Sequence, residues 1–564
     1  MVWSQAMTSR GVSDMREEDA STSRQARLFW AAWFLAFGTL SALWPRDAGF
    51  DVMHYHLHNG WSALHGRLHH DLAPAEMHSF LNPVWNIVVW WLIEHLPGPV
   101  VAFLLGLVQG ALLPALYGLT RRLSRVLGAP LGWRVALFIA ALGCITAPAW
   151  SSFASIRNDH LGALAFIMGL WLVLPREARG QVSIKSLALG ALLVGGAAGL
   201  KLTNVIYVPA FAVFVLILAP GWSTRLRNGL VAAGAGLVAF LVLAGPWMWV
   251  LWQEFANPVY PMFAGLFSGP EAPLEATRDT RYLPGSTSQA IWRPVLASWN
   301  GLLINETPVR DLRLGLGYLA AFGIVGRARQ FWRGADEAPQ RAGLALGVSL
   351  LVLIFVWLSL FAIMRYALAA WLLAPLMGWV LLPSLGIQWP AGRKGYALAG
   401  LTAALLIFTI SPERTRRIPW TSPTEPYITV ERPDMFDYDG ALILIASEFP
   451  AAFTATAFPE ARITHIDPQD WSEPFLARYR PRIDAAIEAQ TGPLYLIHCW
   501  PKRIGEDDAS AIFDAYTAEM ALDSIRSRHD LAIAKPGCQP LPTSFSTEYT
   551  SWQICPLTQE SDRP

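Results

Sequence analysis

The chain is short of charged residues, cysteines and nucleotide-binding motifs, and each shortage excludes a class of protein. Only 15% of its 564 residues are charged and 53% are apolar, and the mean hydropathy of +0.34 is too high for a soluble globular protein. A net charge of +1 gives no reason to expect a nucleic-acid partner. Four cysteines are too few for a disulfide-rich scaffold, and neither a GxGxxG motif nor a P-loop is present.

Apolar residues are abundant instead, and they form runs long enough to cross a membrane. The 26 tryptophans and 27 phenylalanines suit the lipid–water boundaries of such a protein. The first run, Leu28–Trp44, is not followed by a small-residue cleavage pattern, so we expect it to remain as a signal anchor. Residues 1–27 are polar and mixed in charge, which predicts a disordered cytoplasmic tail.

The topology depends on how the next two apolar segments are placed. Pro99–Leu119 is about 20 residues long, enough to cross about 30 Å of hydrocarbon. Phe80–Leu96 is shorter and carries Glu94 and His95. If it also crossed, the four arginines at positions 121–134 would face outward. The positive-inside rule therefore favours a Phe80–Leu96 helix that lies along the membrane surface.

This placement predicts eleven spans in an inner (plasma) membrane, with a cytoplasmic N-terminus and an extracytoplasmic C-terminus. The nine later spans are expected at residues 133–150, 160–175, 186–200, 204–220, 229–251, 313–326, 342–363, 366–384 and 396–412. Cytoplasmic loops then carry clusters of arginine and lysine, whereas short outer connections carry single cations. Residues 252–312 and 413–564 are long segments on the outer side.

The last segment, residues 413–564, has the composition of a small extracytoplasmic α/β domain. Its strands are expected at Ala441–Ala446, Arg462–Ile466 and Pro493–His498, and its helices at Pro481–Ala489 and Ala509–Arg528. An oxidising compartment would allow a disulfide between Cys538 and Cys555, although their spacing alone does not establish one. The predicted fold class is a polytopic α-helical membrane domain over residues 28–412, with surface helices in its first outer loop, followed by this domain.

Outside the C-terminal region, Gly49–Asn86 in the first outer loop is the most polar stretch beside the apolar runs, and it holds seven of the 12 histidines. If the chain after Asp51 is α-helical, Asp51, His54, Tyr55 and His58 share one face of that helix. Asp51, its pKa raised by partial burial, could then act as a general base while the other three contact a substrate. Alternatively, Asp51 only caps the helix.

A second polar cluster, Ser151–His160, lies between two spans and contains Arg157 and Asp159. Ionisable groups at a membrane boundary usually face a cavity, which makes Asp159 the second candidate catalytic carboxylate and Arg157 a candidate substrate contact. The alternative is that both side chains merely cap helix ends.

Lys201 and Arg365 are lone cations on the predicted outer side, against the bias of the positive-inside rule. Lys201 ends a run of small residues, and Arg365, followed by Tyr366, opens a later span. A bound phosphate at the membrane surface would explain these cations, which makes Lys201, Arg365 and the adjoining Tyr366 candidate substrate contacts. The alternative is that each side chain snorkels to lipid headgroups.

The histidines invite a metal interpretation, because His54 and His58, and His65 and His69, have i, i+4 spacing. No HExxH pattern accompanies them, so no dedicated metal site is predicted, and at most a divalent cation binds weakly. Further along, Asn257–Pro261 forms a rigid turn before an outer segment. That segment, with the polar residues Arg278, Asp279, Arg281 and Tyr282, could close as a lid or serve only as a connector.

The order of these features resembles the GT-C glycosyltransferases, in particular the bacterial aminoarabinose transferase and protein O-mannosyltransferase branch. The resemblance covers residues 28–412 and rests on Asp51 after the first span, Asp159 between the third and fourth, Lys201 at the end of GGAAGLK, and Arg365 in RYALAAWLLAPL. NPVYP after GPW is similar to uncharacterised bacterial members. The acidic pair of a DxD-type metal motif is missing, which puts an obligatory metal in doubt.

The resemblance implies transfer of a sugar from a polyprenyl-phosphate carrier to a lipid, glycan or protein on the outer face. By position, Asp51 would activate the acceptor, Asp159 would orient a substrate, and Lys201 with Arg365 would stabilise the leaving phosphate. A transporter or lipid-carrier flippase is the alternative, although its polar groups would gather near mid-membrane. A non-catalytic receptor that works through the C-terminal domain is the third.

Overall fold

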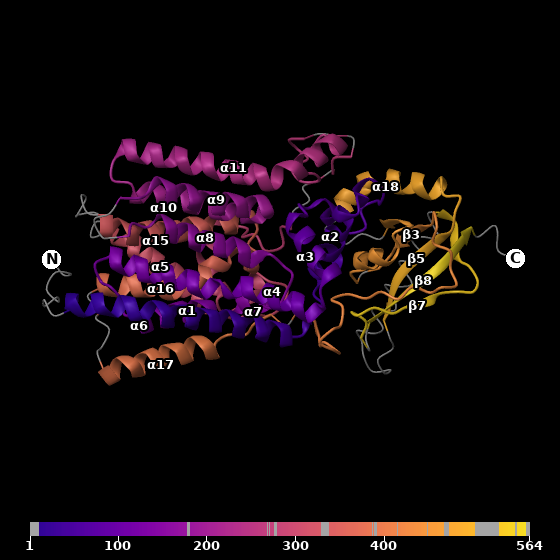
Figure 1. Ribbon diagram of the computed structural model, residues 1–564. Helices are drawn as coiled ribbons and strands as arrows, with labels where there is room; N and C mark the ends of the chain where they lie inside the picture. Colours follow the sequence, from indigo (N-terminus) through magenta and orange to yellow (C-terminus); the bar gives the residue numbers. More distant parts are fainter. Residues whose placement is uncertain are drawn as a thin grey trace.

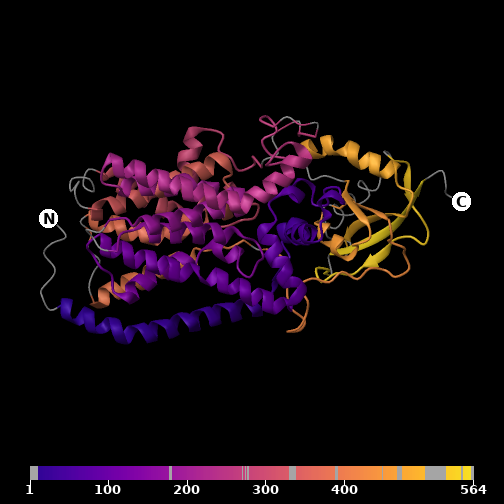
Figure 2. The same cartoon turned by 45° about the horizontal axis from the view of Figure 1, so that its top comes forward.

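A computed structural model describes residues 11–176, 181–267, 269, 271–273, 275, 279–328, 338–385, 387, 392–413, 415–447, 449–466, 473–501, 529–547 and 550–559. The chain folds into a bundle of long helices with a sheet domain at one end (Figure 1). Figure 2 shows the same division after rotation, with the first helix running along the edge of the bundle. The protein is thus a polytopic helical membrane protein with a C-terminal mixed β-sheet domain.

The bundle is built from long and short helices. They are α1 (Gly11–Leu43), α4 (Gly98–Gly110), α5 (Leu112–Val126), α6 (Trp133–Cys144), α7 (Ala147–Ser151), α8 (Asp159–Val173), α9 (Ile184–Leu200), α10 (Tyr207–Leu218), α11 (Trp222–Phe255), α12 (Thr287–Ala297), α13 (Arg313–Gly326), α15 (Ala338–Leu360), α16 (Leu368–Ser384) and α17 (Gly392–Phe408). Helices α4 and α5 together form one continuous candidate span, Gly98–Val126.

Within the described residues, five helical segments are long and apolar enough to cross a membrane, and five shorter apolar helices accompany them. The long ones are Arg24–Leu43, Gly98–Val126, Trp222–Phe255, Arg341–Leu360 and Met364–Ser384. On α11, Leu230, Leu237 and Val242 are 58–65% exposed, which suits contact with lipid rather than water. The predicted membrane fold is confirmed, whereas the number of eleven spans stays a prediction.

The N-terminal residues differ from the expected tail. Helix α1 begins at Gly11, so residues 11–27 continue the first span as a helix instead of forming the disordered segment that their polarity predicts. Helix α1 begins at the end of the bundle that lies away from the sheet domain (Figure 1). The predicted placement of the N-terminus and the C-terminal domain on opposite sides of a membrane stays a prediction.

Small residues allow close helix packing and so fix where the helix ends lie. Helix α9 packs along α11, and a Cβ atom at Gly195 would lie only 2.1 Å from the carbonyl oxygen of Gly236. Small residues at such a contact let two helix backbones approach in a membrane. The position of Lys201, directly after α9, depends on this packing.

The first outer loop lies between the bundle and the sheet domain (Figure 1). It contains the π-helix η1 (Val52–His56), α2 (Leu57–Leu64), the 3₁₀ turns η2 (Arg67–His69) and η3 (Glu76–Phe80), and α3 (Val84–His95). Helix α3 has 12 residues and is not among the candidate spans of the described chain. It packs on α2, in agreement with a segment that lies on the surface instead of crossing.

The sheet of the C-terminal domain has the strand order β4-β3-β5-β8-β6, and β7 also pairs with β8. The strands are β3 (Leu442–Ile445), β4 (Arg462–His465), β5 (Leu494–Pro501), β6 (Leu531–Ile533), β7 (Gln539–Leu541) and β8 (Thr550–Gln559). Strands β4, β3 and β5 are parallel, whereas β8 runs antiparallel to β5, β6 and β7. The predicted strands are the parallel half.

The antiparallel half was not predicted, because β6 and β7 have only three residues each and β8 mixes apolar residues with proline and polar ones. Helix α18 (Glu473–Glu488) begins earlier than the predicted Pro481 and includes that proline. The helix predicted at Ala509–Arg528 falls outside the described residues. Cys538 and Cys555 form the disulfide that the sequence analysis left open, and Cys499 is buried.

Candidate active site

Four charged side chains meet at the end of the bundle that faces the sheet domain, and each comes from a different element. Asp51 directly precedes η1, Asp159 is the first residue of α8, Lys201 follows α9, and Arg365 lies in the 3₁₀ turn η6 (Met364–Ala367). These are the two carboxylates and two lone cations that the sequence analysis selected. Their positions differ by more than 300 in sequence, so only the fold brings them together.

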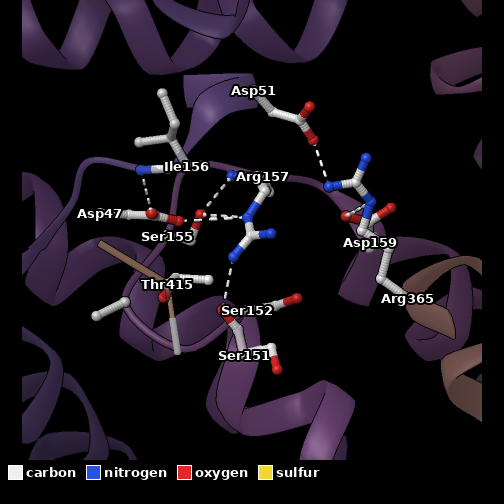
Figure 3. Close-up of polar contacts among 12 residues, drawn as sticks. Asp47, Asp51, Ser151, Ser152, Ser155, Ile156, Arg157, Asp159, Arg365 and Thr415 are labelled. Atoms are coloured by element: carbon white, nitrogen blue, oxygen red, sulfur yellow. Dashed lines mark hydrogen bonds and ion pairs between the residues drawn. The ribbon is translucent and has the colours of Figure 1, made fainter. Parts of the chain in front are cut away.

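The four charges form a chain of ion pairs with Arg365 at its centre. Arg365 Nη1 pairs with Asp51 Oδ2, and its Nε lies 3.9 Å from Asp159 Oδ2. Lys201 Nζ donates to Asp159 Oδ1 at 2.6 Å. Figure 3 shows Arg365 pointing toward both carboxylates. The side chains of Arg365 and Asp51 are 22% and 16% exposed, so this ion pair is not fully buried.

Asp51 does not cap a helix, because its side chain makes no hydrogen bond to the following backbone N–H groups. The expected direction of its pKa is also wrong. Burial alone would raise the pKa of Asp51, but the guanidinium of Arg365, aided by His56, Arg157 and Lys201, holds it well below its usual value. Asp51 is therefore a carboxylate held in an ion pair.

Asp159, Lys201 and Arg365 also make contacts that the capping and snorkelling alternatives do not predict. Asn158, not Asp159, occupies the N-cap of α8, and the oxygens of Asp159 face Lys201 and Arg365 instead of backbone N–H groups. Lys201 and Arg365 are turned inward to these partners rather than to lipid headgroups. The ring of Tyr366 lies 5.0 Å from Lys201 Nζ and 5.3 Å from the guanidinium carbon of Arg365, and so backs both cations.

The predicted helix face after Asp51 is only partly correct, because residues 52–56 form a π-helix. A π-helix has i→i+5 hydrogen bonds and more residues per turn than an α-helix, which brings His56 within electrostatic reach of Asp51. Burial lowers the pKa of His56 to about 4, and Lys201, Asp51 and Asp159 are the charges that act on it. Sequence reasoning missed His56, since it sought the α-helical spacing.

The three predicted neighbours of Asp51 take different places. Tyr55 stays at the site, where burial and the charge of Asp51 raise the pKa of its hydroxyl. His54 packs against His78, with ring centres 5.2 Å apart. His58 bonds Asn59 instead, at 3.2 Å, and its imidazole is affected by Asp71 rather than by the site carboxylates.

Arg157 is a neighbour of the site rather than part of the ion-pair chain. Its Nε lies 3.2 Å from Oδ2 of Asp47, an aspartate that sequence reasoning did not single out. Arg157 also donates to the hydroxyl of Ser155 and to the backbone oxygen of Ser151 (Figure 3). Asp47 lies four residues before Asp51, and no pattern in the sequence distinguishes the roles of these two aspartates.

The described residues contain no group of three His, Cys, Asp or Glu side chains arranged to hold a metal ion. Burial lowers the pKa of His78 to about 4 and that of His465 to about 3, so these imidazoles are neutral at pH 7. In the outer segment that could be a lid or a connector, Asp279 and Arg281 pair at 2.8 Å, and Arg278 falls outside the described residues.

The sequence is also similar to that of a glycosyltransferase, although not to any family model. No protein-family model matches the chain. It is 26% identical over 370 residues to the polyprenol-phosphate-mannose-dependent alpha-(1-2)-phosphatidylinositol pentamannoside mannosyltransferase of Mycolicibacterium smegmatis (strain ATCC 700084 / mc(2)155), a match that covers 61% of this chain and 77% of that protein. The similarity agrees with the resemblance to GT-C glycosyltransferases.

Among solved structures, the fold is similar to that of ArnT from Cupriavidus metallidurans, crystallised with undecaprenyl phosphate. The TM-score is 0.47 at 12% identity, and the match covers 94% of this chain and 98% of ArnT.

Proposed function

We propose that this protein is a membrane glycosyltransferase that takes a sugar from a polyprenyl-phosphate carrier and passes it to a lipid, glycan or protein acceptor. The observation that carries the proposal is the chain of ion pairs Asp51–Arg365–Asp159–Lys201 at one end of the bundle. A base and two phosphate-binding cations are the groups that such a transfer requires. The similarity to a polyprenol-phosphate-mannose-dependent mannosyltransferase supports the same donor class.

In the proposed reaction, the acceptor hydroxyl attacks C1 of the donor sugar. The C1–O bond to phosphate breaks, its electron pair stays on the phosphate oxygen, and Asp51 takes the acceptor proton. The donor phosphodiester carries one negative charge and the polyprenyl phosphate product approaches two. Arg365 and Lys201 stabilise the added charge, so these cations act most strongly in the transition state.

Arg365 also regulates the base, because the same guanidinium serves Asp51 and the phosphate. Without donor, the ion pair holds the pKa of Asp51 below its usual value and makes it a weak base. A donor phosphate competes for Arg365, and Asp51 becomes a stronger base as the ion pair weakens. Activation of the acceptor thus follows donor binding.

The remaining predicted substrate contacts receive separate roles in this proposal. Asp159 holds Lys201, and Tyr55 and Tyr366 line the site near the charged groups. His54 contacts the loop residue His78, and the environment of His58 gives no support to a substrate role. A divalent cation is not required, because two protein cations supply the positive charge.

The proposed topology has eleven spans, with the site and the sheet domain on the outer side of the inner membrane. Its test is labelling with a membrane-impermeant thiol reagent in a Cys144→Ala background. A cysteine at Gly132 is expected to stay unlabelled in intact cells, whereas one at Ser288 on α12 should react. Both positions are exposed, and Gly132 has φ −61° with no heavy atom within 4 Å of an added Cβ. Labelling at Gly132 but not at Ser288 would invert the topology.

The proposed activity is tested with purified protein in lipid vesicles and radiolabelled polyprenyl-phosphate mannose as the first donor. Transfer of label to glycolipid, glycan or protein, with release of polyprenyl phosphate, is the expected result. Mass spectrometry of envelope glycans from a deletion strain extends the test to other sugars. Movement of the intact donor across the vesicle membrane without bond cleavage would favour the flippase alternative instead.

A further inference from the structure

Two arginines and one aspartate join the segments that carry the site carboxylates. Asp47 lies four positions before Asp51, and Arg157 lies two positions before Asp159. Their side chains pair at 3.2 Å, and 0% of Asp47 and 6% of Arg157 is exposed. Asp47 Oδ1 also accepts from the backbone N–H of Gly49 at 2.8 Å. A single buried contact therefore fixes one carboxylate-bearing segment against the other.

The third member comes from the segment that leads into the sheet domain. Strand β1 (Arg46–Asp47) pairs antiparallel with β2 (Arg417–Ile418), which places Asp47 opposite Arg417. The guanidinium of Arg417 donates to the backbone oxygens of Ala154 and Ser151, 3.4 and 3.2 Å away. Arg417 thus contacts the loop before α8 while its backbone holds the loop before η1.

Arg46 on β1 and Arg416, the residue before β2, attach this pair of strands to the C-terminal domain. Arg46 Nη1 donates to the backbone oxygen of Tyr427 at 2.9 Å, and its guanidinium also pairs with Glu425. Arg416 donates to the backbone oxygen of Phe545 at 2.9 Å. Any shift of the sheet domain relative to the bundle therefore reaches the two carboxylate-bearing loops directly.

We propose that Asp47, Arg157 and Arg417 form a clamp through which the C-terminal domain sets the distance between Asp51 and Asp159. Asp47 is a positioning residue in this scheme, and the sheet domain is part of the transfer machinery even if it binds no substrate. The role in transfer rests on the proposed function, whereas the coupling of the two loops does not. Burial would raise the pKa of Asp47, but Arg157 and Arg417 hold it below its usual value, so the clamp is charged.

The test is Asp47→Asn, which keeps the shape of the side chain and removes its charge. Loosening the clamp should increase amide hydrogen exchange in both segments, residues 44–56 and 151–160, because they share this contact. It should also lower kcat by about 10- to 100-fold, since misplacement by about 1 Å costs that much in a positioned site. The KM for polyprenyl-phosphate mannose should change by less than about threefold, because Arg365 and Lys201 remain.

Asp71→Asn is the matched control. Asp71 pairs with Arg67 at 2.7 Å, is equally buried, and also joins the first outer loop to the sheet domain through the N–H of Ile463. The Asp71→Asn substitution should lower thermal stability without a change in kcat or in hydrogen exchange at residues 151–160. Arg417 is only half-buried, so Arg417→Gln is less prone to misfold than Asp47→Asn. It should reproduce the kinetic effect of Asp47→Asn.

The clamp is overturned if exchange rises in only one of the two segments, or if kcat falls equally in the Asp71→Asn control. If the wild-type protein transfers no mannose while both segments still respond to Asp47→Asn, the proposed function fails for this donor and the structural coupling stands. If transfer is normal in both Asp47→Asn and Arg417→Gln, the clamp fails and the proposed function stands.

Discussion

Replacement of Asp51 by asparagine is expected to lower the transfer rate by about 100- to 10,000-fold, the usual contribution of a positioned general base. The amide has the size of the carboxylate and can still accept a hydrogen bond from Arg365, but it cannot take the acceptor proton. Donor binding should be retained or improved, because Arg365 is then free of its ion pair. Initial rates with radiolabelled polyprenyl-phosphate mannose measure the first effect, and quenching of tryptophan fluorescence by the donor measures the second.

Glu94→Gln provides the control for this substitution. Glu94 lies on the surface helix α3, accepts a hydrogen bond from Trp90, and is outside the ion-pair chain. The same loss of one negative charge from the first outer loop should leave the rate unchanged. A transfer rate for Asp51→Asn that matches wild type would remove Asp51 from the chemistry and leave Asp159 as the carboxylate to test.

The gathering of the four charges could be predicted from sequence because a topological rule orders the helix ends. Once Phe80–Leu96 is kept out of the membrane, Asp51, Asp159, Lys201 and Arg365 all fall on one side. Because the bundle is narrow, residues at the same end of it lie close to one another. The parallel strands of the C-terminal domain were predictable for a similar reason, since buried strands are continuous apolar runs.

The remainder depends on contacts that have no local signature. One π-helical turn, at residues 52–56, moved His56 to the site and His58 away from it, and no side-chain pattern distinguishes it from an α-helical turn. The role of Asp47 required knowing that Arg417, 370 positions later in the sequence, pairs with it. The direction of the Asp51 pKa depended on whether burial or Arg365 dominates, and only the position of that guanidinium decides it.

Replacement of Arg365 by glutamine is expected to have the second large effect, on both the donor and the base. Loss of one cation from the leaving phosphate should lower kcat/KM by about 100- to 1,000-fold. Lysine should restore only part of this loss, because it keeps the charge but not the fork that reaches Asp51 and Asp159 together. Arg293→Gln is the control, since Arg293 bonds only backbone oxygens of Tyr282 and Leu303 among its described side-chain hydrogen bonds.

The pH dependence of kcat/KM separates the effect on the base from the effect on the phosphate. In the wild-type protein, Arg365 holds the pKa of Asp51 well below its usual value, so Asp51 is ionised throughout pH 5–8 and causes no loss of rate toward acid. In Arg365→Gln the burial of Asp51 is no longer offset by its strongest partner, and its pKa must rise. The rate should then fall as the pH is lowered, within a range where the wild-type rate is flat. An acid limb at the same pH in both proteins would mean that Arg365 binds phosphate without controlling Asp51.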